Sequence, residues 1–172
     1  MVYIKDMKFP NGSLIEICTF PGMEIHKLMA EISTQVETSF FIDTCGNMAA
    51  MGIKCHRVFD IKHLFEYVAE LKKHSNFYLF IDTITFLIDI SNQIDENKYT
   101  PQKFYNELWS LIYKNGATVI VSNHYKMNKI NGKAIVKPRM GILWYRIISY
   151  RIFMEWKGEE IIFRLDEFKG AE

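Results

Sequence analysis

Three apolar runs in this sequence end in polar residues that could contact a bound ion or phosphate. They read FFIDTCG, YLFIDTITFL and TVIVSNH, and the first two place Asp43 and Asp82 at the end of the run. In open parallel sheets, ligands bind beyond the carboxyl ends of the strands. An aspartate at that edge can lie near a metal-bound nucleotide. An aspartate after a strand also caps a helix or turn in many proteins, so the pattern alone leaves both roles open.

The segment EICTFPGMEIHKLMAE, residues 16–31, has the order of elements that holds phosphate in α/β proteins. An apolar run leads into a loop with Gly22, and a helical pattern follows. A phosphate loop of the type G-x-x-x-x-G-K-[ST] supplies backbone N–H groups, a lysine and a hydroxyl. The segment lacks this pattern, and Pro21 removes one backbone donor. The frame of a phosphate site is therefore present without its usual ligands.

The periodicity of the chain predicts strands that alternate with helices. Strand patterns cover residues 12–18, 39–43, 77–82 and 117–122, and helical patterns cover 23–36, 61–74 and 100–115. Strands that are apolar on both faces predict an α/β fold with a mostly parallel sheet flanked by helices. Two β-type runs on either side of Lys157-Gly158 predict a C-terminal antiparallel hairpin. Since no linker interrupts the 172 residues, we expect a single domain over residues 1–172.

Composition and cysteine spacing argue against several classes of protein. With 15% aromatic residues the chain is not expected to be disordered, and no apolar run approaches the roughly 20 residues that cross a bilayer. The first residues include Lys5, Asp6 and Lys8 where a signal peptide needs an apolar stretch, so we expect an intracellular protein. The three cysteines form no C-x-x-C pair, which favours reduced cysteines over disulfides or a zinc site.

Five segments in register give the chain a resemblance to the RecA/RadA recombinase superfamily. NGSLIEIC resembles the strand before the family's phosphate loop, FFIDTCG its second strand, YLFIDTITFLI its Walker B strand, and TVIVSNH its strand ending in Asn-Gln. KPRMGILWYRIISYRIFM resembles the Pro-x-Leu-Gly-x-x-Trp signature of the recombinase paralogues and the Arg-bearing strand after it. The resemblance implies a RecA-like P-loop NTPase core over nearly the whole chain, without the family's N-terminal helical domain.

Compared with the family's phosphate loop, this chain departs at each functional position. Thr19 and Glu24 stand where the family has its two glycines. Ile25 stands in place of the lysine, and His26 in place of the Ser or Thr. Phosphoryl transfer depends on positioning and charge neutralisation, so the resemblance implies no catalytic residue, no cofactor and no metal. The residues of this degenerate nucleotide site are Thr19, Gly22, Glu24, Ile25, His26, Cys45 (in place of the catalytic Glu) and Asp82 (the retained Walker B carboxylate).

The basic residues are concentrated between Leu108 and Met154. That stretch has eight basic residues and no acid, so with a net charge of +1 the remainder carries −7. An acid-free run of this length favours a polyanion or an acidic partner. Within it we expect a long basic loop from His124 to Gly141, at the place of a family loop that lines the single-stranded DNA channel. The candidate DNA-binding residues are Lys126, Lys129, Lys133, Lys137, Arg139 and, for base stacking, Tyr125.

The resemblance implies a binding protein and not an enzyme: a non-catalytic recombinase paralogue, as in the Shu-complex subunits and a small nematode recombinase-interacting paralogue. Its partners would be another paralogue in a heterodimer, a RecA/RadA-type recombinase filament that it helps to assemble or remodel during homologous recombination repair, and single-stranded DNA. The location would be the nucleus, or the cytoplasm of a prokaryote, with no membrane contact. Asp82, Asp166 and Trp144 are expected at the partner interface.

Two alternatives to this function stay open at the level of sequence. One is a protein scaffold within a paralogue complex that does not touch DNA. The other is an ATPase with a non-standard phosphate loop that uses Lys27 and Asp82. The first of the two family loops that line the DNA channel corresponds here to residues 91–99, which contain Asp95 and Glu96 and are not expected to bind DNA.

Overall fold

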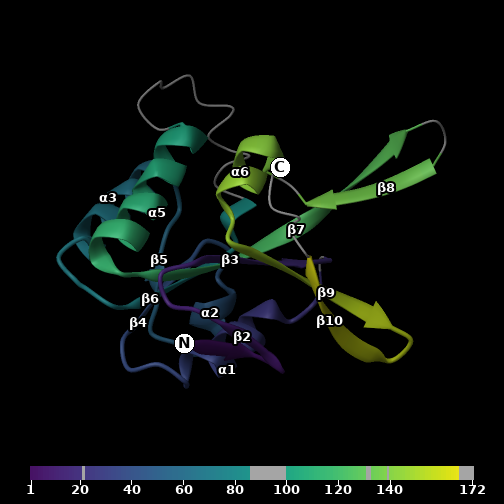
Figure 1. Ribbon diagram of the computed structural model, residues 1–172, viewed down its shortest axis with the longest axis horizontal. Helices are drawn as coiled ribbons and strands as arrows, with labels where there is room; N and C mark the ends of the chain where they lie inside the picture. The colour runs from purple at the N-terminus through teal and green to yellow at the C-terminus, as the bar shows by residue number, and fades with distance from the viewer. Residues whose placement is uncertain (21, 86–99, 131–132, 139, 167–172) are drawn as a thin grey trace.

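A computed structural model of the chain describes residues 1–20, 22–85, 100–130, 133–138 and 140–166, with the backbone alone at 126–130, 133–138 and 141–142. The strands of the main sheet are β3 (Leu14–Thr19), β4 (Ser39–Asp43), β5 (His56–Arg57), β6 (Tyr78–Asp82), β7 (Thr118–Ile130), β8 (Lys133–Pro138), β9 (Tyr150–Lys157) and β10 (Glu160–Asp166). Seven of them run across the molecule in the order β10-β9-β3-β7-β6-β4-β5, and β8 pairs with β7 outside this path (Figure 1). The pairs β3–β7, β3–β9, β6–β7, β4–β6 and β4–β5 are parallel, whereas β9–β10 is antiparallel. The predicted α/β fold and its C-terminal hairpin are confirmed.

Helices cover both faces of this sheet. The remaining elements are α1 (Ile25–Ser33), α2 (Asn47–Ala50), α3 (Ile61–Leu71), α5 (Pro101–Asn115), α6 (Gly141–Ile147) and a small hairpin of β1 (Val2–Ile4) and β2 (Met7–Phe9). Alternate residues of each central strand enter two separate cores. In β6, for example, Leu79 and Ile81 pack with α3, α5 and α6, whereas Phe80 packs with α1 and the β1–β2 hairpin. The result is a sheet between two apolar layers, with α3 and α5 on one side and α1 on the other (Figure 1).

Helix α5 begins and ends where the sequence predicts. The side chain of Thr100 accepts a hydrogen bond from the Lys103 backbone N–H at 3.3 Å, and Pro101 occupies the first helical position. Gly116 ends the helix with φ of +65°, and a Cβ there would lie 2.5 Å from the side-chain oxygen of Asn76. Glycine is therefore needed at this position for its conformation and for the space it leaves.

The predicted long loop from His124 to Gly141 is wrong. Strand β7 continues to Ile130, and β8 pairs with it antiparallel, so the two form a ribbon that extends from the body on the same side as the β9–β10 hairpin (Figure 1). The sequence carried a signal for this hairpin that we missed. Only Asn131 and Gly132 separate the strands, and Asn-Gly between β-type runs strongly favours a two-residue hairpin. The end of the predicted loop instead begins α6 at Gly141.

Other short elements carried too weak a pattern to predict, namely β1, β2, α2 and β5, each of two to four residues. Arg139 and residues 91–99, which the sequence analysis singled out, lie outside the described residues. Within the ranges that are described, no helix is both long and apolar enough to cross a bilayer.

Candidate functional site

Both carboxylate oxygens of Asp82, which the sequence analysis compared with the Walker B carboxylate, accept hydrogen bonds from groups of the chain itself. It lies at the end of β6 with 2% of its surface exposed. One of its oxygens accepts a hydrogen bond from the hydroxyl of Ser122 on β7 at 2.6 Å, and the other accepts from the side-chain amide of Asn47 at 3.4 Å. A buried carboxylate needs such donors, because an unpaired buried charge is costly. Both oxygens of Asp82 are thus engaged within the chain.

The other strand-end carboxylate, Asp43 on β4, caps the short helix that follows it. One oxygen accepts from the backbone N–H groups of Gly46 at 2.6 Å and Cys45 at 3.2 Å, and the other accepts from that of Ala49 at 3.0 Å. Of the two roles that the sequence left open for Asp43, the structure thus shows the cap. In the described residues no group of three or more His, Cys, Asp or Glu side chains could hold a metal ion.

The turn that would hold phosphate is packed with apolar and paired side chains. Ile25, at the place of the family's lysine, is 2% exposed and lies in the core between the sheet and α1. Glu24 precedes α1 and forms an ion pair with Lys27 at 2.5 Å. That bond, the largest influence on the carboxyl, lowers the pKa of Glu24, so the carboxylate stays charged where a phosphate would carry negative charge. Both side chains of the pair are more than half exposed.

The remaining residues of the degenerate site take part in ordinary local structure. The hydroxyl of Thr19 donates to the backbone oxygen of Phe20 at 3.3 Å, and Gly22 adopts a φ of +92° in the turn. His26 is partly exposed on the first turn of α1, and Cys45 is exposed beside the Asp43 cap. Ile25, at the place of the family's lysine, is in the core, whereas Lys27 two residues later is exposed and paired with Glu24.

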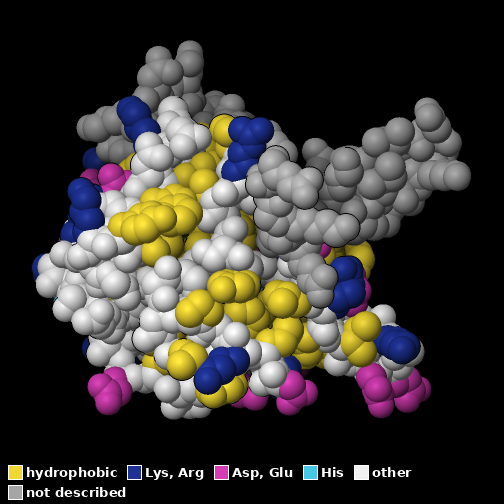
Figure 2. Space-filling model, viewed as in Figure 1, with side chains coloured by type: hydrophobic (Ala, Val, Ile, Leu, Met, Phe, Trp, Pro, Cys, Tyr) yellow, Lys and Arg dark blue, Asp and Glu magenta, His cyan; other side chains and the backbone are white. Residues whose placement is uncertain are grey.

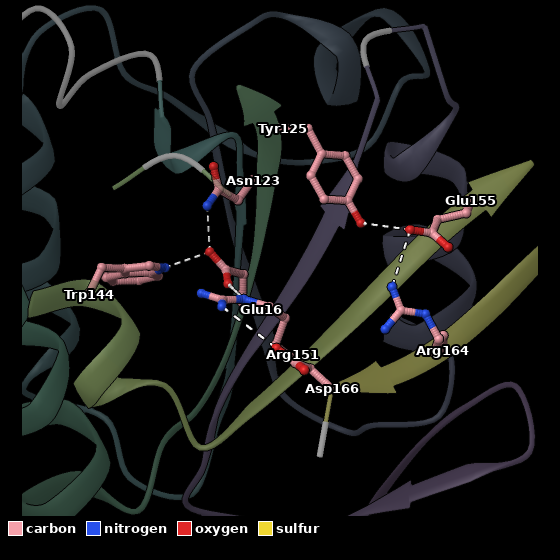
Figure 3. A network of polar contacts seen from close by, with 8 residues as sticks. All are labelled: Glu16, Asn123, Tyr125, Trp144, Arg151, Glu155, Arg164 and Asp166. Carbon is pink, nitrogen blue, oxygen red and sulfur yellow. Dashed lines mark hydrogen bonds and ion pairs between the residues drawn. The ribbon is translucent and has the colours of Figure 1, made fainter. Parts of the chain in front are cut away.

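A buried carboxylate that the sequence analysis did not single out, Glu16 in the middle of β3, organises the neighbouring part of the same edge (Figure 3). Glu16 is fully buried, and one of its oxygens accepts from the side-chain amide of Asn123 and from the indole N–H of Trp144. Its other oxygen accepts from the guanidinium of Arg151 on β9, and the same guanidinium lies 3.8 Å from a carboxylate oxygen of Asp166. A charge and its hydrogen-bond partners are therefore buried together.

This polar network continues across the sheet. The side-chain oxygen of Asn123 accepts from the hydroxyl of Thr85 at 3.2 Å, and that hydroxyl lies 3.0 Å from the hydroxyl of Thr83. The backbone N–H of Thr83 donates to the hydroxyl of Thr44 at 2.9 Å. With Glu16, Arg151 and Asp166, the chain of contacts runs across the sheet from β10 to Thr44, the residue after β4. The polar groups of this edge thus bond to one another.

Two residues predicted for a partner interface are in the interior instead. Trp144 is fully buried and packs its ring against Tyr105 in the core under α6. Asp82 is buried as described above. That prediction is therefore wrong for Trp144 and Asp82, because neither side chain reaches the surface. Asp166 keeps 31% of its side chain exposed while pairing with Arg151, and its interface role stays a prediction.

The ring of Tyr125, predicted to stack on a base, is buried at the base of the β7–β8 ribbon. It is 8% exposed, stacks on Phe153 with ring centroids 5.7 Å apart, and packs against Phe20 at 4.6 Å. Its hydroxyl donates to Glu155 at 3.3 Å, and burial, together with the nearby Cys18 and Glu155, raises the pKa of that phenol. The base-stacking prediction is wrong in this conformation, because the ring is buried and packs against two aromatic rings of the chain.

The four described lysine positions predicted to bind DNA lie on the ribbon. The backbone pairing sets Lys126 opposite Lys137 and Ile130 opposite Lys133, with Lys129 opposite Ala134. Elsewhere, the Lys and Arg side chains on the face drawn in Figure 2 stand apart from one another, so the described side chains of this face form no continuous basic surface. The ribbon thus carries four lysine positions in two paired strands.

The Glu16 network had a signal in the sequence. Glu16 interrupts the apolar run LIEIC, and Arg151 interrupts the apolar run that forms β9. Charged residues are almost never fully buried unless they are paired, so a charge in a buried strand predicts a partner of opposite charge. The sequence did not say which acid would meet which base, because that depends on β9 lying beside β3.

Comparisons with known proteins support the architecture and no closer relationship. No protein family matches the sequence, and no curated protein does so either. Among solved structures, the chain is similar to a crystal structure of the RadB recombinase, with a TM-score of 0.61 and 17% sequence identity over 91% of this chain and 81% of that one. At this identity the likeness establishes the fold alone. The chain thus has an α/β fold like that of the RadB recombinase, with a mostly parallel sheet and a C-terminal antiparallel hairpin.

Proposed function

We propose that this chain is a non-catalytic recombinase paralogue that pairs with another paralogue and contacts single-stranded DNA through the β7–β8 ribbon. In this role it assists a RecA/RadA-type recombinase filament to assemble or remodel during homologous recombination, in the nucleus or in a prokaryotic cytoplasm. The fold likeness to a recombinase supports the general class. The observation that carries the non-catalytic part is that Ile25, at the place of the phosphate-binding lysine, is a core residue.

The state of the surrounding groups supports the same conclusion. Nucleotide-binding sites of this type bring a lysine, a hydroxyl and a carboxylate to the phosphates and magnesium. Here the carboxylate of Asp82 already accepts hydrogen bonds from Ser122 and Asn47. Lys27, the nearest lysine in sequence, is paired with Glu24. A nucleotide would have to displace these contacts before it could use either group.

The DNA part of the proposal depends on charge. Lysines attract the phosphate backbone of a single strand without reading its sequence, and the resulting affinity falls steeply as salt is raised. Four lysines lie on the ribbon within an acid-free stretch of 47 residues, from Leu108 to Met154. With Tyr125 buried, binding is expected to come from backbone contacts and not from stacking on that ring.

Fluorescence anisotropy of a labelled oligo(dT) across a salt series, with and without ATP and magnesium, tests the proposal. We expect affinity that falls with salt and is unchanged by ATP. If the chain is insoluble alone, a co-expressed paralogue is included and also measured by itself.

Two other outcomes would favour the alternatives. If the chain bound ATP and Lys27→Ala abolished that binding, the result would support an ATPase that uses Lys27 and Asp82. The presence of Asp82 is the observation that favours this alternative. An absence of DNA binding at low salt would support a protein scaffold without DNA contact.

A further inference from the structure

The pairing of β7 with β8 sorts the residues of the ribbon onto two faces. Residues directly opposite each other in an antiparallel pair share a face, and successive residues of one strand alternate between faces. The first face holds the positions of Lys126, Asn128, Ile130, Lys133, Ile135 and Lys137, and the second holds those of Tyr125, Met127, Lys129, Ala134, Val136 and Pro138. We call these the lysine face and the tyrosine face.

The lysines are divided unequally between the two faces. Three of the four described lysine positions belong to the lysine face, whereas Lys129 is alone on the tyrosine face among mostly apolar positions. Sequence proximity gives no hint of this division, because Lys129 lies between Lys126 and Lys133 along the chain. Only the register separates Lys129 from the others.

The described base of the ribbon shows which face lies toward the body. Tyr125, the first residue of the tyrosine face, packs its ring against Phe20 and Phe153. Phe153 belongs to β9, so at its base the tyrosine face lies against the β9–β10 side of the molecule. The lysine face therefore begins on the opposite side of the ribbon, away from these aromatic residues.

The register also places two like charges together. Lys126 and Lys137 are directly opposite each other, where residues are closest across the ribbon, and like charges at such positions destabilise strand pairing. A polyanion bound over that face would relieve the repulsion. Lys133 is four residues from Lys137 on the same strand, so the lysine face spans roughly 14 Å at about 3.4 Å per residue. That length matches a short run of phosphates along a single strand.

We infer that single-stranded DNA binds through its phosphate backbone to the lysine face, using Lys126, Lys133 and Lys137, and that Lys129 takes no part. This inference rests on the proposed DNA-binding function and adds to it the face and the individual residues. A general basic patch would use Lys129 and Lys133 alike, because both are near the tip of the ribbon and carry the same charge. The inference instead predicts that only Lys133 contacts the DNA.

The test compares Lys133→Gln with Lys129→Gln, two variants that each remove one positive charge near the tip. Affinity for labelled oligo(dT) is measured at several salt concentrations. Each phosphate contact on a single strand contributes about 0.7 to the slope of log affinity against log salt. We expect Lys133→Gln to reduce the slope by about 0.7 and to weaken binding about fivefold near 0.1 M salt. Lys129→Gln should change affinity by less than about twofold, since it loses no phosphate contact.

The triple variant Lys126→Gln, Lys133→Gln, Lys137→Gln should reduce the slope by about 2. Circular dichroism of every variant checks that the fold is retained, and the slope is compared only among folded variants. Equal losses for Lys129→Gln and Lys133→Gln would overturn the assignment to one face while leaving the proposed DNA binding intact. If the unaltered protein did not bind DNA at low salt, both the assignment to one face and the proposed DNA binding would be wrong.

Discussion

The carboxyl edge of the sheet and the β7–β8 ribbon deal with charge in opposite ways. At the edge, Glu16, Asp82 and Asp43 are buried and each accepts hydrogen bonds from donors within the chain. On the ribbon, the register brings Lys126 and Lys137 together with no acid anywhere in the strands. The carboxylates of the edge are hydrogen-bonded without a ligand, whereas the ribbon has an excess of one sign.

The two regions are joined at the end of the core part of β7. Asn123 donates to Glu16 at the edge, and two residues later Tyr125 anchors the base of the ribbon to Glu155 and Phe153. Through Arg151 and Asp166, and through Glu155 and Arg164, both contacts reach the β9–β10 hairpin (Figure 3). Side-chain contacts therefore hold the base of the ribbon in position.

The largest effect is expected from removing the buried carboxylate of the edge. Glu16→Leu would leave the guanidinium of Arg151 buried without that carboxylate and would take away the acceptor used by Asn123 and Trp144. Breaking a buried ion pair by deleting one partner typically costs about 3–5 kcal/mol. We expect a loss of that size in the free energy of unfolding, measured by urea titration.

The control for Glu16→Leu is an exposed ion pair on the neighbouring β9–β10 hairpin. Arg164 pairs with Glu155 at 3.4 Å, and its side chain is 55% exposed. Arg164→Ala should cost no more than about 1 kcal/mol, as is usual for surface pairs. If the two variants lost similar stability, the buried contacts of Glu16 would not stabilise the fold more than an exposed ion pair does.

The next effect concerns the turn that would hold phosphate. Ile25→Ala removes a side chain that is 2% exposed and packed in the core, and such truncations cost about 2–5 kcal/mol. Lys27→Ala, two residues later on the exposed side of α1, should cost less than about 1 kcal/mol. Thermal or urea unfolding of both variants measures the difference. If Ile25→Ala lost little stability, the Ile25 side chain would not be an essential part of the core. The turn before α1 could then bind a ligand.

Much of the fold could be predicted from the sequence because its signals are local. Apolar runs bounded by polar residues gave β4 and β6, and Thr100-Pro101 with Gly116 gave the limits of α5. The ribbon was missed because its strands mix lysines with apolar residues, which resembles a basic loop, and because the Asn131-Gly132 signal was not used. Composition alone does not distinguish a solvent-exposed ribbon from a loop.

The candidate site was harder to predict because it depends on contacts between distant residues. That Glu16 meets Arg151, 135 positions away, follows from β9 lying parallel to β3. The burial of Tyr125 depends in the same way on Phe153 from that neighbouring hairpin. The sequence analysis singled out Asp82 and Ile25, but only the structure shows that Asp82 accepts a hydrogen bond from Ser122 and that Ile25 is a core residue.

The smallest effect concerns Tyr125, where the ribbon meets the body. Its pKa is raised in the folded protein by burial and by Cys18 and Glu155. The unfolded phenol loses its proton near pH 10, whereas the folded one keeps it, so the folded state binds more protons above that pH and stability falls as pH rises. One such proton corresponds to about 1.4 kcal/mol per pH unit. The contribution of the protonated Tyr125 to the free energy of unfolding is therefore fully present below pH 10 and is lost as the pH rises above it.

Tyr125→Phe separates this effect from those of other tyrosines. At pH 8 the variant should be less stable by about 1 kcal/mol, because it lacks the hydrogen bond to Glu155. Between pH 10 and pH 11 the gap should close or reverse, because only the unaltered protein has this phenol to titrate. Tyr105, whose pKa burial raises to about 12, is present in both proteins and cancels. Urea unfolding at the two pH values measures this difference in stability. A difference that stays constant would mean that the base of the ribbon opens to solvent and that the tyrosine face is not held against the body.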